Sequence, residues 1–398
     1  SRPYDLLVWG ATGFTGKLVV KHLVKHAPKH VRWAVGGRDK GKLENALALA
    51  GANVDVLVAD SMNQAEIDEV VSKTRVILTT VGPYARYGSS IVDACVRHGT
   101  HYTDITGETY WVLKNIEKYQ AAAIAKGIRI VHCCGFDSIP SDIGTWLVLD
   151  EAKKAGGDVE DVTAVHTAKG GAASGGTIHS ILGMMTDLAA LRVMQDPFHL
   201  APPGSSRAMA PRNFFWPKWE PVLRLWMCPF VMAPCNIAIV RRSAAVCQPP
   251  YTAVRYNEAM GVPYWPLALL VSSFVLVGTP ILAVLLRVPL LGKCIWKLAP
   301  APGTGPSEKV QRESEFTVQL VARRKADPKP VARVTLIGHG DPGYQETSKM
   351  VSEAALCMAD PETERKLPPA SGFLTPASAF GMALVDRMRN VGFTFRTG

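Results

Sequence analysis

Gly10-Ala11-Thr12-Gly13-Phe14-Thr15-Gly16 decides the fold of this 398-residue chain. The stretch follows a short apolar run, Asp5–Trp9, and opens an amphipathic one, Phe14–His26. A tight turn from strand to helix needs glycine where the backbone bends and where it approaches a ligand. The N–H groups that begin the helix then attract an anion. In this context the GxxGxxG spacing predicts a turn that holds the phosphates of a dinucleotide.

The remainder of the first third alternates short apolar runs with amphipathic stretches. Such alternation predicts parallel strands joined by right-handed helical crossovers. We therefore expect an α/β fold in which residues 1–135 form a doubly wound parallel sheet of the Rossmann type. The further strand candidates are Val31–Val35, Val54–Val58, Arg75–Thr79, His101–Asp104 and Ile128–Cys133, and the helix candidates between them are Lys40–Ala50, Gln64–Ser72, Tyr87–Arg97 and Tyr110–Ala125.

The end of the second predicted strand bears on the choice of cofactor. In such sheets an acidic residue there binds the ribose 2′-hydroxyl of NAD, whereas an arginine accommodates the 2′-phosphate of NADP. Arg38 comes first after the glycines and Asp39 second. Arg38 therefore favours NADP, and Asp39 leaves NAD as the alternative.

Two more positions are expected to meet the cofactor. Asp60 ends the third predicted strand, where it contacts the adenine or is an ordinary turn residue. Gly82 and Pro83 follow the fourth strand, at the edge where the nicotinamide and the substrate would meet. The predicted cofactor-binding residues are Gly10, Thr12, Gly13, Phe14, Thr15, Gly16, Arg38, Asp60, Gly82 and Pro83.

The pattern changes after the first domain. Val159–Ala168 reads as a strand and Thr177–Met194 as a helix. Glu315–Arg323 and Val331–His339 read as an antiparallel hairpin, because a short polar turn joins them. Thr347–Met358 and Pro376–Asn390 again look helical. We assign residues 136–371 to a second, α+β domain.

Composition narrows the class of protein. Hydrophobic residues make up 47% and charged residues 20% of the chain, as in globular proteins. The net charge of +10 suits a phosphate-bearing cofactor or an anionic lipid surface, and no nucleic-acid motif accompanies it. The 8 cysteines are scattered without a metal-binding spacing, so we expect no metal site. Scattered thiols favour a reducing, intracellular compartment.

One segment departs from this globular pattern. No charged residue lies between Glu258 and Arg287, and Leu267–Leu286 is continuously apolar apart from small polar residues. At 1.5 Å per residue, its 20 residues match a bilayer core of about 30 Å. Gly278-Thr279-Pro280 is expected to interrupt the helix. Residues 263–291 are therefore a hairpin that enters one leaflet or a lipid droplet, an oligomer interface, or a buried helix pair.

Several segments together resemble the saccharopine dehydrogenase-like oxidoreductases, which include trans-acting enoyl reductases of lipid synthesis. They extend over nearly the whole chain. The most specific is Gly135–Gly144, which reads GFDSIPSDIG. The matching segments are Gly10–Gly16, Val81–Tyr84, Asp104–Glu108, Cys134–Gly144, Ser174–Thr177, Gly372–Pro376 and Gly392–Phe395.

The resemblance implies a Rossmann domain, a second α+β domain and a C-terminal segment, residues 372–398, that packs back on the first domain. It also implies an NAD(P)-dependent oxidoreductase. Saccharopine itself carries several carboxylates, which would need convergent Arg or Lys side chains. The sequence shows no such group, so saccharopine is not the expected substrate.

The sequence offers three candidates for proton transfer. Tyr84 lies in the loop nearest the expected nicotinamide, Glu108 follows the fifth strand, and Asp137 precedes a helix. The alternative for Asp137 is helix capping together with Ser138. His166 is more simply a packed or surface histidine than a base.

The leading hypothesis is an NADP-dependent reductase at the cytosolic face of a membrane or lipid droplet, acting on a hydrophobic, lipid-like molecule. The membrane contact would be made through residues 263–291, and a homodimer is a further expectation. The alternative is a non-catalytic Rossmann-fold scaffold or redox sensor on a membrane surface.

Overall fold

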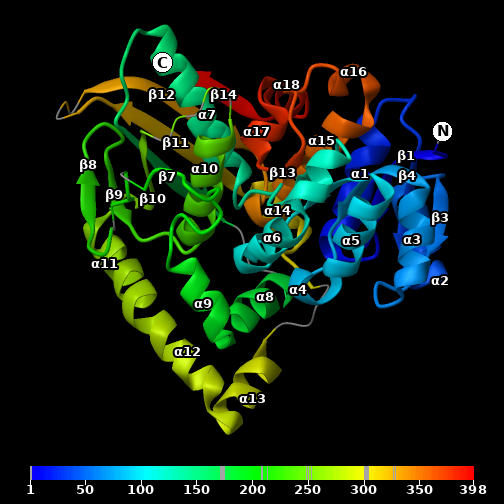
Figure 1. The fold of residues 1–398 in the computed structure, drawn as a ribbon. Helices are drawn as coiled ribbons and strands as arrows, with labels where there is room; N and C mark the ends of the chain where they lie inside the picture. The colour runs from blue at the N-terminus through cyan, green and yellow to red at the C-terminus, as the bar shows by residue number, and fades with distance from the viewer. Residues whose placement is uncertain are drawn as a thin grey trace.

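The computed structural model describes residues 2–398 except 171–174, 208, 213, 248, 250, 252, 300–303, 326 and 328. Ser174, in one of the segments that carry the family resemblance, therefore lies outside the described residues. Two seven-stranded sheets form the body of the molecule, and a long helical hairpin extends from it (Figure 1). The α/β class expected from the sequence is confirmed.

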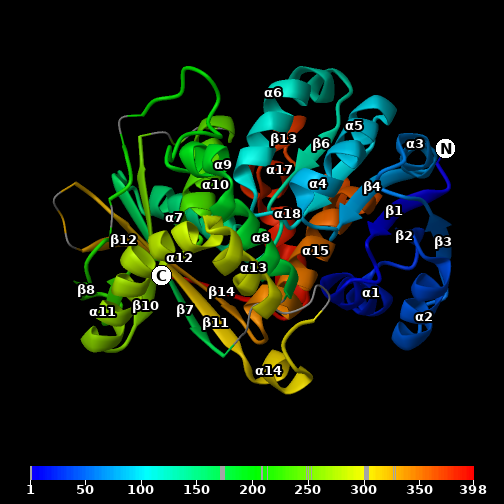
Figure 2. The ribbon, with the colours of Figure 1, turned by 90° about the horizontal axis from the view of Figure 1, so that it is seen from below.

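The first sheet is parallel throughout, in the order β13-β6-β5-β4-β1-β2-β3. Leu6, Leu7 and Val8 of its central strand are fully buried, as a strand covered on both faces requires. Figure 2 shows α5 and α6 on one side of this sheet and α1 and α15 on the other. The strands are β1 Tyr4–Trp9, β2 Trp33–Gly37, β3 Asp55–Val58, β4 Thr74–Thr79, β5 His101–Asp104, β6 Arg129–Val131 and β13 Gly372–Leu374.

The helices of this half lie close to their predicted ranges. Glycine ends two of them in the left-handed conformation, Gly51 after α2 and Gly99 after α5. The predicted helix Tyr87–Arg97 corresponds to α5, which begins two residues later, and a separate short helix, α4, precedes it. The helices are α1 Phe14–His26, α2 Lys40–Ala50, α3 Gln64–Ser72, α4 Tyr84–Tyr87, α5 Ser89–His98 and α6 Thr109–Ala125.

The second sheet is mixed, in the order β14-β12-β11-β7-β10-β9-β8. Only β7 and β10 pair in parallel among the described strands of this sheet. The helix α7, Ile139–Lys154, covers β11 and β12, and α10, Ala233–Val246, packs against β10. The strands are β7 Asp161–Lys169, β8 Lys218–Glu220, β9 Leu225–Cys228, β10 Arg255–Val262, β11 Glu315–Arg323, β12 Pro330–Gly338 and β14 Thr394–Thr397.

Two predicted helices are divided in the structure. Asp187 separates α8, Gly175–Thr186, from α9, Leu188–Met194, and its side chain caps α9. Gly381, at a φ of 50°, separates α17, Pro376–Phe380, from α18, Met382–Asn390. Both breaks have local causes, because a capping carboxylate starts a new helix and only glycine adopts that φ easily.

The domain boundaries need two corrections. The helix α15, Thr347–Ala359, falls in the range assigned to the second domain, yet it packs against β1, β4 and β5 of the first sheet. A helix buried on nearly all sides, as this one is, must lie between other elements. The segment 372–398 is shared between the sheets: β13 joins the first, beside β6, and β14 joins the second, beside β12. The C-terminal segment therefore connects both halves.

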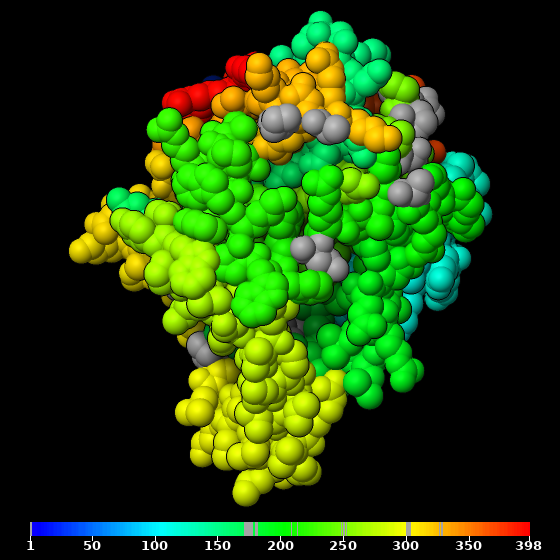
Figure 3. Space-filling model, turned by 90° about the vertical axis from the view of Figure 1, so that its left-hand side faces the viewer, coloured from blue at the N-terminus to red at the C-terminus, as the bar shows by residue number. Residues whose placement is uncertain are grey.

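The apolar segment forms the hairpin that extends from the body (Figure 3). One helical rod, Trp265–Arg287, contains α11 Trp265–Ser273, a π-helical turn Phe274–Gly278 and α12 Thr279–Arg287. The chain then turns at Val288 into α13, Pro289–Leu298. The interruption expected at Gly278–Pro280 is wrong, because the wider π turn accommodates Pro280 without ending the helix. The alternative of a buried helix pair is also wrong, since only 11% of the most apolar 18-residue stretch of this rod is buried inside the molecule.

Candidate functional site

The turn between β1 and α1 is built so that two of its glycines have no substitute. Gly10 has a φ of 90°, and a Cβ atom there would lie 2.4 Å from Val81 Cγ2. A Cβ atom on Gly16 would lie 2.1 Å from the carbonyl oxygen of Gly10. Gly13, which donates its N–H to that same oxygen, is less confined. Glycine at these two positions is therefore required by the close packing of the turn on Val81 and on its own backbone.

The first turn of α1 is suited to bind an anion. It contains no acidic residue, and no side chain of the described residues caps it. Its leading N–H groups, from Phe14, Thr15 and Gly16, have no partner within the helix. Thr12 and Thr15 are half-buried beside them. The ring of Phe14 turns toward the second half of the chain, 5.2 Å from the ring of Tyr344, so its backbone is the part that faces the turn.

Arg38 and Asp39 are distinguished by their partners. The carboxylate of Asp39 accepts the N–H of Lys42 at 3.0 Å and caps α2, and this bond lowers its pKa. Arg38 is exposed and bonds to none of the described residues. Asp60 accepts the N–H of Met62 at 3.0 Å in a turn after β3. The guanidinium of Arg38, rather than the carboxylate of Asp39, is thus the free group at the end of β2, where the ribose is expected.

Glu108 and Tyr84 support the Gly82–Pro83 loop from inside. The two carboxylate oxygens of Glu108 accept the N–H groups of Tyr84 and Ala85, each at 2.9 Å. The hydroxyl of Tyr84 donates to the carbonyl of Thr79 at 3.3 Å. Burial raises the pKa of both side chains. The structure therefore gives both candidates a role in shaping the loop, whereas Gly82 and Pro83 are themselves exposed.

A buried carboxylate that the sequence analysis did not select holds the neighbouring loops. Asp104, at the end of β5, accepts the backbone N–H groups of Thr106 and Cys133 through Oδ1. Its Oδ2 lies 2.9 Å from the hydroxyl of Tyr102 and 2.6 Å from Nδ1 of His132. Its position at a strand end and its place at the start of the matching segment Asp104–Glu108 were the signals that the sequence offered. Asp104 fixes the loop that leads to Asp137.

Asp137 is half-buried where the loop after β6 meets the second sheet. Burial and the nearby charge of Glu258 raise its pKa to about 6, while His166 opposes the shift. Helix capping by Ser138 is wrong: its hydroxyl makes no cap bond and donates to Asn236 Oδ1 at 3.0 Å. Of the three proton-transfer candidates, Asp137 alone lies near a further ionisable pair in the gap between the sheets.

That pair is His166 of β7 and Glu258 of β10. The two strands are parallel neighbours, with His166 opposite Met260. Glu258 is therefore diagonal to His166 on the same face of the sheet. The atoms His166 Nε2 and Glu258 Oε1 lie 2.6 Å apart and are buried. The sequence could not show this contact, because it depends on the pairing of two strands that are far apart in the chain.

Comparisons with known proteins show the family and the fold of the chain. Residues 6–131 match the saccharopine dehydrogenase NADP binding domain. A putative trans-acting enoyl reductase of Mycobacterium tuberculosis is 34% identical over all of this chain and 98% of its own length. A trans-acting enoyl reductase of Mycobacterium leprae is 31% identical, with the same coverage.

The chain belongs to the saccharopine dehydrogenase-like oxidoreductase family. A solved structure agrees on the fold: apo saccharopine dehydrogenase (L-Glu forming) of Saccharomyces cerevisiae has a TM-score of 0.57 and 12% identity, over 99% of both chains. The resemblance deduced from the motifs and the expectation of an NAD(P)-dependent oxidoreductase are thereby confirmed. The family's cofactor-binding domain, residues 6–131, contains the strands β1 to β6.

Proposed function

We propose that this protein is an NADPH-dependent reductase of enoyl groups on a hydrophobic, lipid-like substrate, working at a membrane surface. The choice of NADPH rests on one observation, the different partners of two neighbouring residues at the end of β2. Asp39 is engaged in capping α2, and Arg38 is left for a 2′-phosphate. The non-catalytic alternative is not favoured by relatives that are named enoyl reductases.

The residues present fit a dinucleotide. Only glycine fits at Gly10 and Gly16, and the glycine turn and the uncapped helix start would hold the pyrophosphate. When bound, NADPH supplies a hydride. The loop Gly82–Pro83, fixed by Glu108, would then position the reacting carbon beside the nicotinamide. The protein's remaining task is to exclude water and to supply one proton.

An apolar substrate agrees with the side chains of the second half. Met232 lies beside Gly107 of the first sheet's loops, and around His166 the rings of Phe230 and of Phe136, from the loop after β6, gather. The buried Arg241 and Arg242 are bound to backbone carbonyls, such as those of Val254 and Phe373. They are therefore not free to bind the carboxylates of saccharopine.

Calorimetric titration of the purified protein with NADPH and with NADH tests the cofactor choice. We expect tighter binding of NADPH. Arg38→Ala should weaken NADPH binding about 10- to 100-fold, because hydrogen bonds between charged groups contribute about 1.5–3 kcal/mol. NADH binding should change little. Lys25→Ala, an exposed cation in the last turn of α1 and so at the end of the helix far from the glycine turn, is the control. Equal losses for both cofactors would contradict the role of Arg38.

The membrane part of the proposal rests on the outer face of the hairpin. Seven apolar side chains, each at least 41% exposed, repeat at alternating steps of three and four residues. On the opposite face Ala268, Ser272 and Leu286 are buried, and the residues of that face between Ser272 and Leu286 are half-buried. A rod buried on one side and apolar on the other suits a helix that lies along a lipid surface. The seven side chains, called the outer stripe below, are Leu267, Leu270, Phe274, Val277, Ile281, Val284 and Val288.

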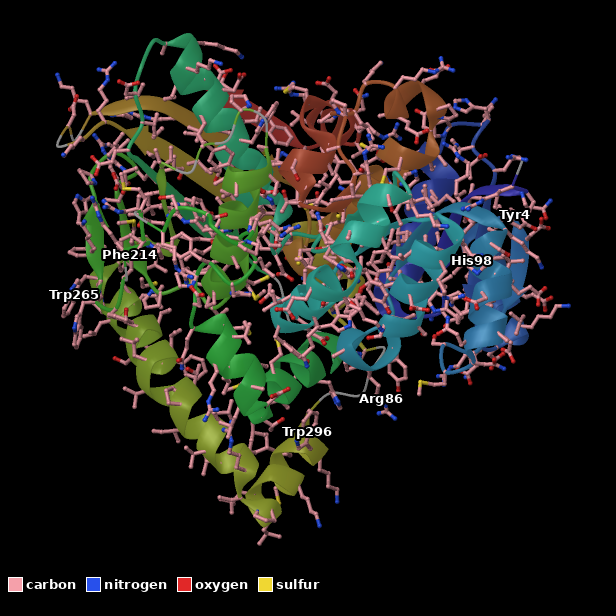
Figure 4. The ribbon with its side chains drawn as sticks, viewed as in Figure 1. Tyr4, Arg86, His98, Phe214, Trp265 and Trp296 are labelled. Carbon is pink, nitrogen blue, oxygen red and sulfur yellow. The ribbon has the colours of Figure 1, made fainter. Side chains whose placement is uncertain are left out.

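The ends of the hairpin resemble those of interfacial segments. Figure 4 shows Trp265 where the long helix leaves the body, and Trp296 on α13. Exposed cations, Arg287, Lys293 and Lys297, lie at the far turn and along α13. Tryptophan and lysine are typical of the boundary between lipid and water.

The alternative to lipid as the partner of the outer stripe is a second copy of the chain, since the stripe has the spacing of a coiled-coil seam. Coiled coils, however, place charged residues beside the seam to select the partner. No charged residue lies between Trp265 and Leu286, so the flanks of the stripe are apolar as well. Lipid tolerates apolar flanks, whereas a water-soluble helix pair would leave them exposed.

Flotation with vesicles of phosphatidylcholine and phosphatidylserine tests the membrane contact. We expect the wild type to float, and the variant L270S/F274S/V277S/I281S to stay in the bottom fraction. These side chains are exposed, so their replacement should not unfold the body. The matched control is L49S/M62S/I124S, which replaces exposed apolar residues of the first domain. A wild type that stays at the bottom as a dimer, with a monomeric stripe variant, would assign the stripe to a second copy.

A further inference from the structure

The pair His166–Glu258 lies at the centre of a buried polar cluster between the two sheets. The hydroxyl of Ser141 and the amide of Asn236 both donate to Glu258 Oε1, each at 2.8 Å. His166 Nε2 lies 2.6 Å from the same oxygen and 3.2 Å from Ser141 Oγ. Three donors thus converge on one carboxylate oxygen, which fixes both the position of the carboxylate and the orientation of the imidazole.

The other ends of both side chains have no partner. His166 Nδ1 and Glu258 Oε2 are buried and make no hydrogen bond to any described residue. Buried polar atoms are almost always paired in folded proteins, so an unpaired one calls for an explanation such as a catalytic role. Phe230 stacks on the imidazole at 4.5 Å and Phe136 meets its edge at 6.0 Å. The open nitrogen is therefore held rigidly in an apolar surrounding.

We propose that His166 donates, from Nδ1, the proton that completes the reduction, and that Glu258 is the positioning residue that keeps the other proton on Nε2. This inference rests on the proposed function. A carboxylate on one imidazole nitrogen determines the tautomer and leaves the second nitrogen for chemistry. The location agrees, because the pair faces the loop after β6, at the edge of the sheet where the substrate would lie.

NADPH, which the glycine turn would hold, would supply a hydride to the β-carbon of the enoyl group and be oxidised to NADP⁺, while the π electrons move toward the carbonyl. Before this step the imidazole of His166 carries a proton on each nitrogen. The α-carbon then forms its C–H bond with the proton of Nδ1, and the Nδ1–H bond breaks. His166 is left neutral with its proton on Nε2, beside Glu258. Solvent returns one proton to Nδ1 before the next turnover.

The charged and titratable groups around His166 come from two parts of the chain, the strand β10 and the loop before α7. Glu258 and Tyr256 lie on β10, and Asp137 lies before α7. Burial, and next the charge of Glu258, raise the pKa of Tyr256 well above its ordinary value, so it stays neutral. Asp137 is half-buried, and its charge interacts with both members of the pair. It is the only one of these three groups, Glu258, Tyr256 and Asp137, that is partly exposed.

NADPH oxidation with the N-acetylcysteamine thioester of trans-2-dodecenoic acid tests the donor. We expect His166→Gln to lower kcat at least about 100-fold while NADPH binding stays within about 2-fold, since proton transfer contributes about 10²–10⁴. Glu258→Gln should move the alkaline limb of the pH–rate profile, where the donor loses its proton, to lower pH, which a merely structural role would not do. His339→Gln, an exposed histidine, is the control.

Nitrogen-15 NMR of the histidine-labelled protein gives a readout besides activity. The signal that disappears in His166→Gln should report a proton on Nε2 in the wild type, and should change in Glu258→Gln. A proton on Nδ1 alone would overturn the inference. So would an active wild type whose His166→Gln variant keeps more than half of the rate, which leaves the proposed function intact. A wild type that oxidises no NADPH with this thioester would overturn both.

Discussion

Arg38 and Asp39 are neighbours in the sequence but have different partners in the structure. The carboxylate caps a helix, and the guanidinium makes no hydrogen bond to any residue that the structure describes. Glu108 is a similar case, because both of its oxygens accept backbone N–H groups and neither is free to act on a substrate. At the scale of the residue, hydrogen-bond partners decide which of several ionisable groups remain available for function.

Asp142 provides a test of this view. It lies on α7, is fully buried, and accepts the N–H of Ala377 at 2.7 Å and the hydroxyl of Ser243. Burial raises its pKa to about 7, from 3.8 for an ordinary aspartate. The unfolded chain therefore loses the proton at a lower pH than the folded chain does. The free energy of unfolding should fall as the pH rises from about 4 to about 7, and then level off.

Asp142→Asn should remove that contribution. Relative to the wild type, the variant should gain stability as the pH rises across this range, by a few kcal/mol at about 1.4 kcal/mol per pKa unit. Urea unfolding at intervals between pH 4 and pH 8 measures the difference. A difference that does not depend on pH would mean that the carboxyl titrates in the folded protein as it does in the unfolded one.

At the scale of the element, the first domain could be predicted because its signals are local. The ranges of α1, α2 and α3 follow from apolar periodicity, and the glycine turn from its spacing. In the second half, β8 and β9 have 3 and 4 residues, too few to show a period. The pairing of β7 with β10 joins distant segments, so the contact of His166 with Glu258 was beyond local patterns.

The hairpin that extends from the body also shows what could not be predicted from the sequence. Its length and hydropathy were evident in the sequence, but the sequence could not show which side of the helix is covered. The outer stripe became visible only when the structure buried Ala268, Ser272 and Leu286. The π turn before Thr279 likewise depends on how the helix adapts to Pro280.

At the scale of the whole molecule, the candidate site depends on how the two sheets are joined. Asp137 belongs to a loop of the first sheet, whereas His166 and Glu258 belong to the second. The C-terminal segment contributes a strand to each sheet. Any contact that fixes this segment therefore also fixes the distance between the cofactor turn and the polar cluster.

Arg242 of α10 is the side chain that makes this connection most directly. It is 3% exposed, donates to the carbonyl of Phe373 in β13 at 2.6 Å and to that of Leu200 at 2.8 Å, and has no carboxylate partner among the described residues. Burial lowers its pKa to about 10. A buried cation held by carbonyl groups alone has no substitute of similar shape, because Lys lacks the planar fork that reaches both.

Arg242→Leu should therefore lower the free energy of unfolding by about 2–4 kcal/mol, since it leaves two buried carbonyl groups without donors. Urea denaturation measures the loss, and Arg192→Leu, an exposed position on α9, should change it by less than about 0.5 kcal/mol. The activity of the candidate site should fall as well, because β13 lies beside β6, and the loop after β6 contains Asp137. At low denaturant, where the variant is still folded, enoyl reduction should fall more than NADPH binding does. Equal losses of enoyl reduction and of NADPH binding would mean that Arg242 acts through global stability alone.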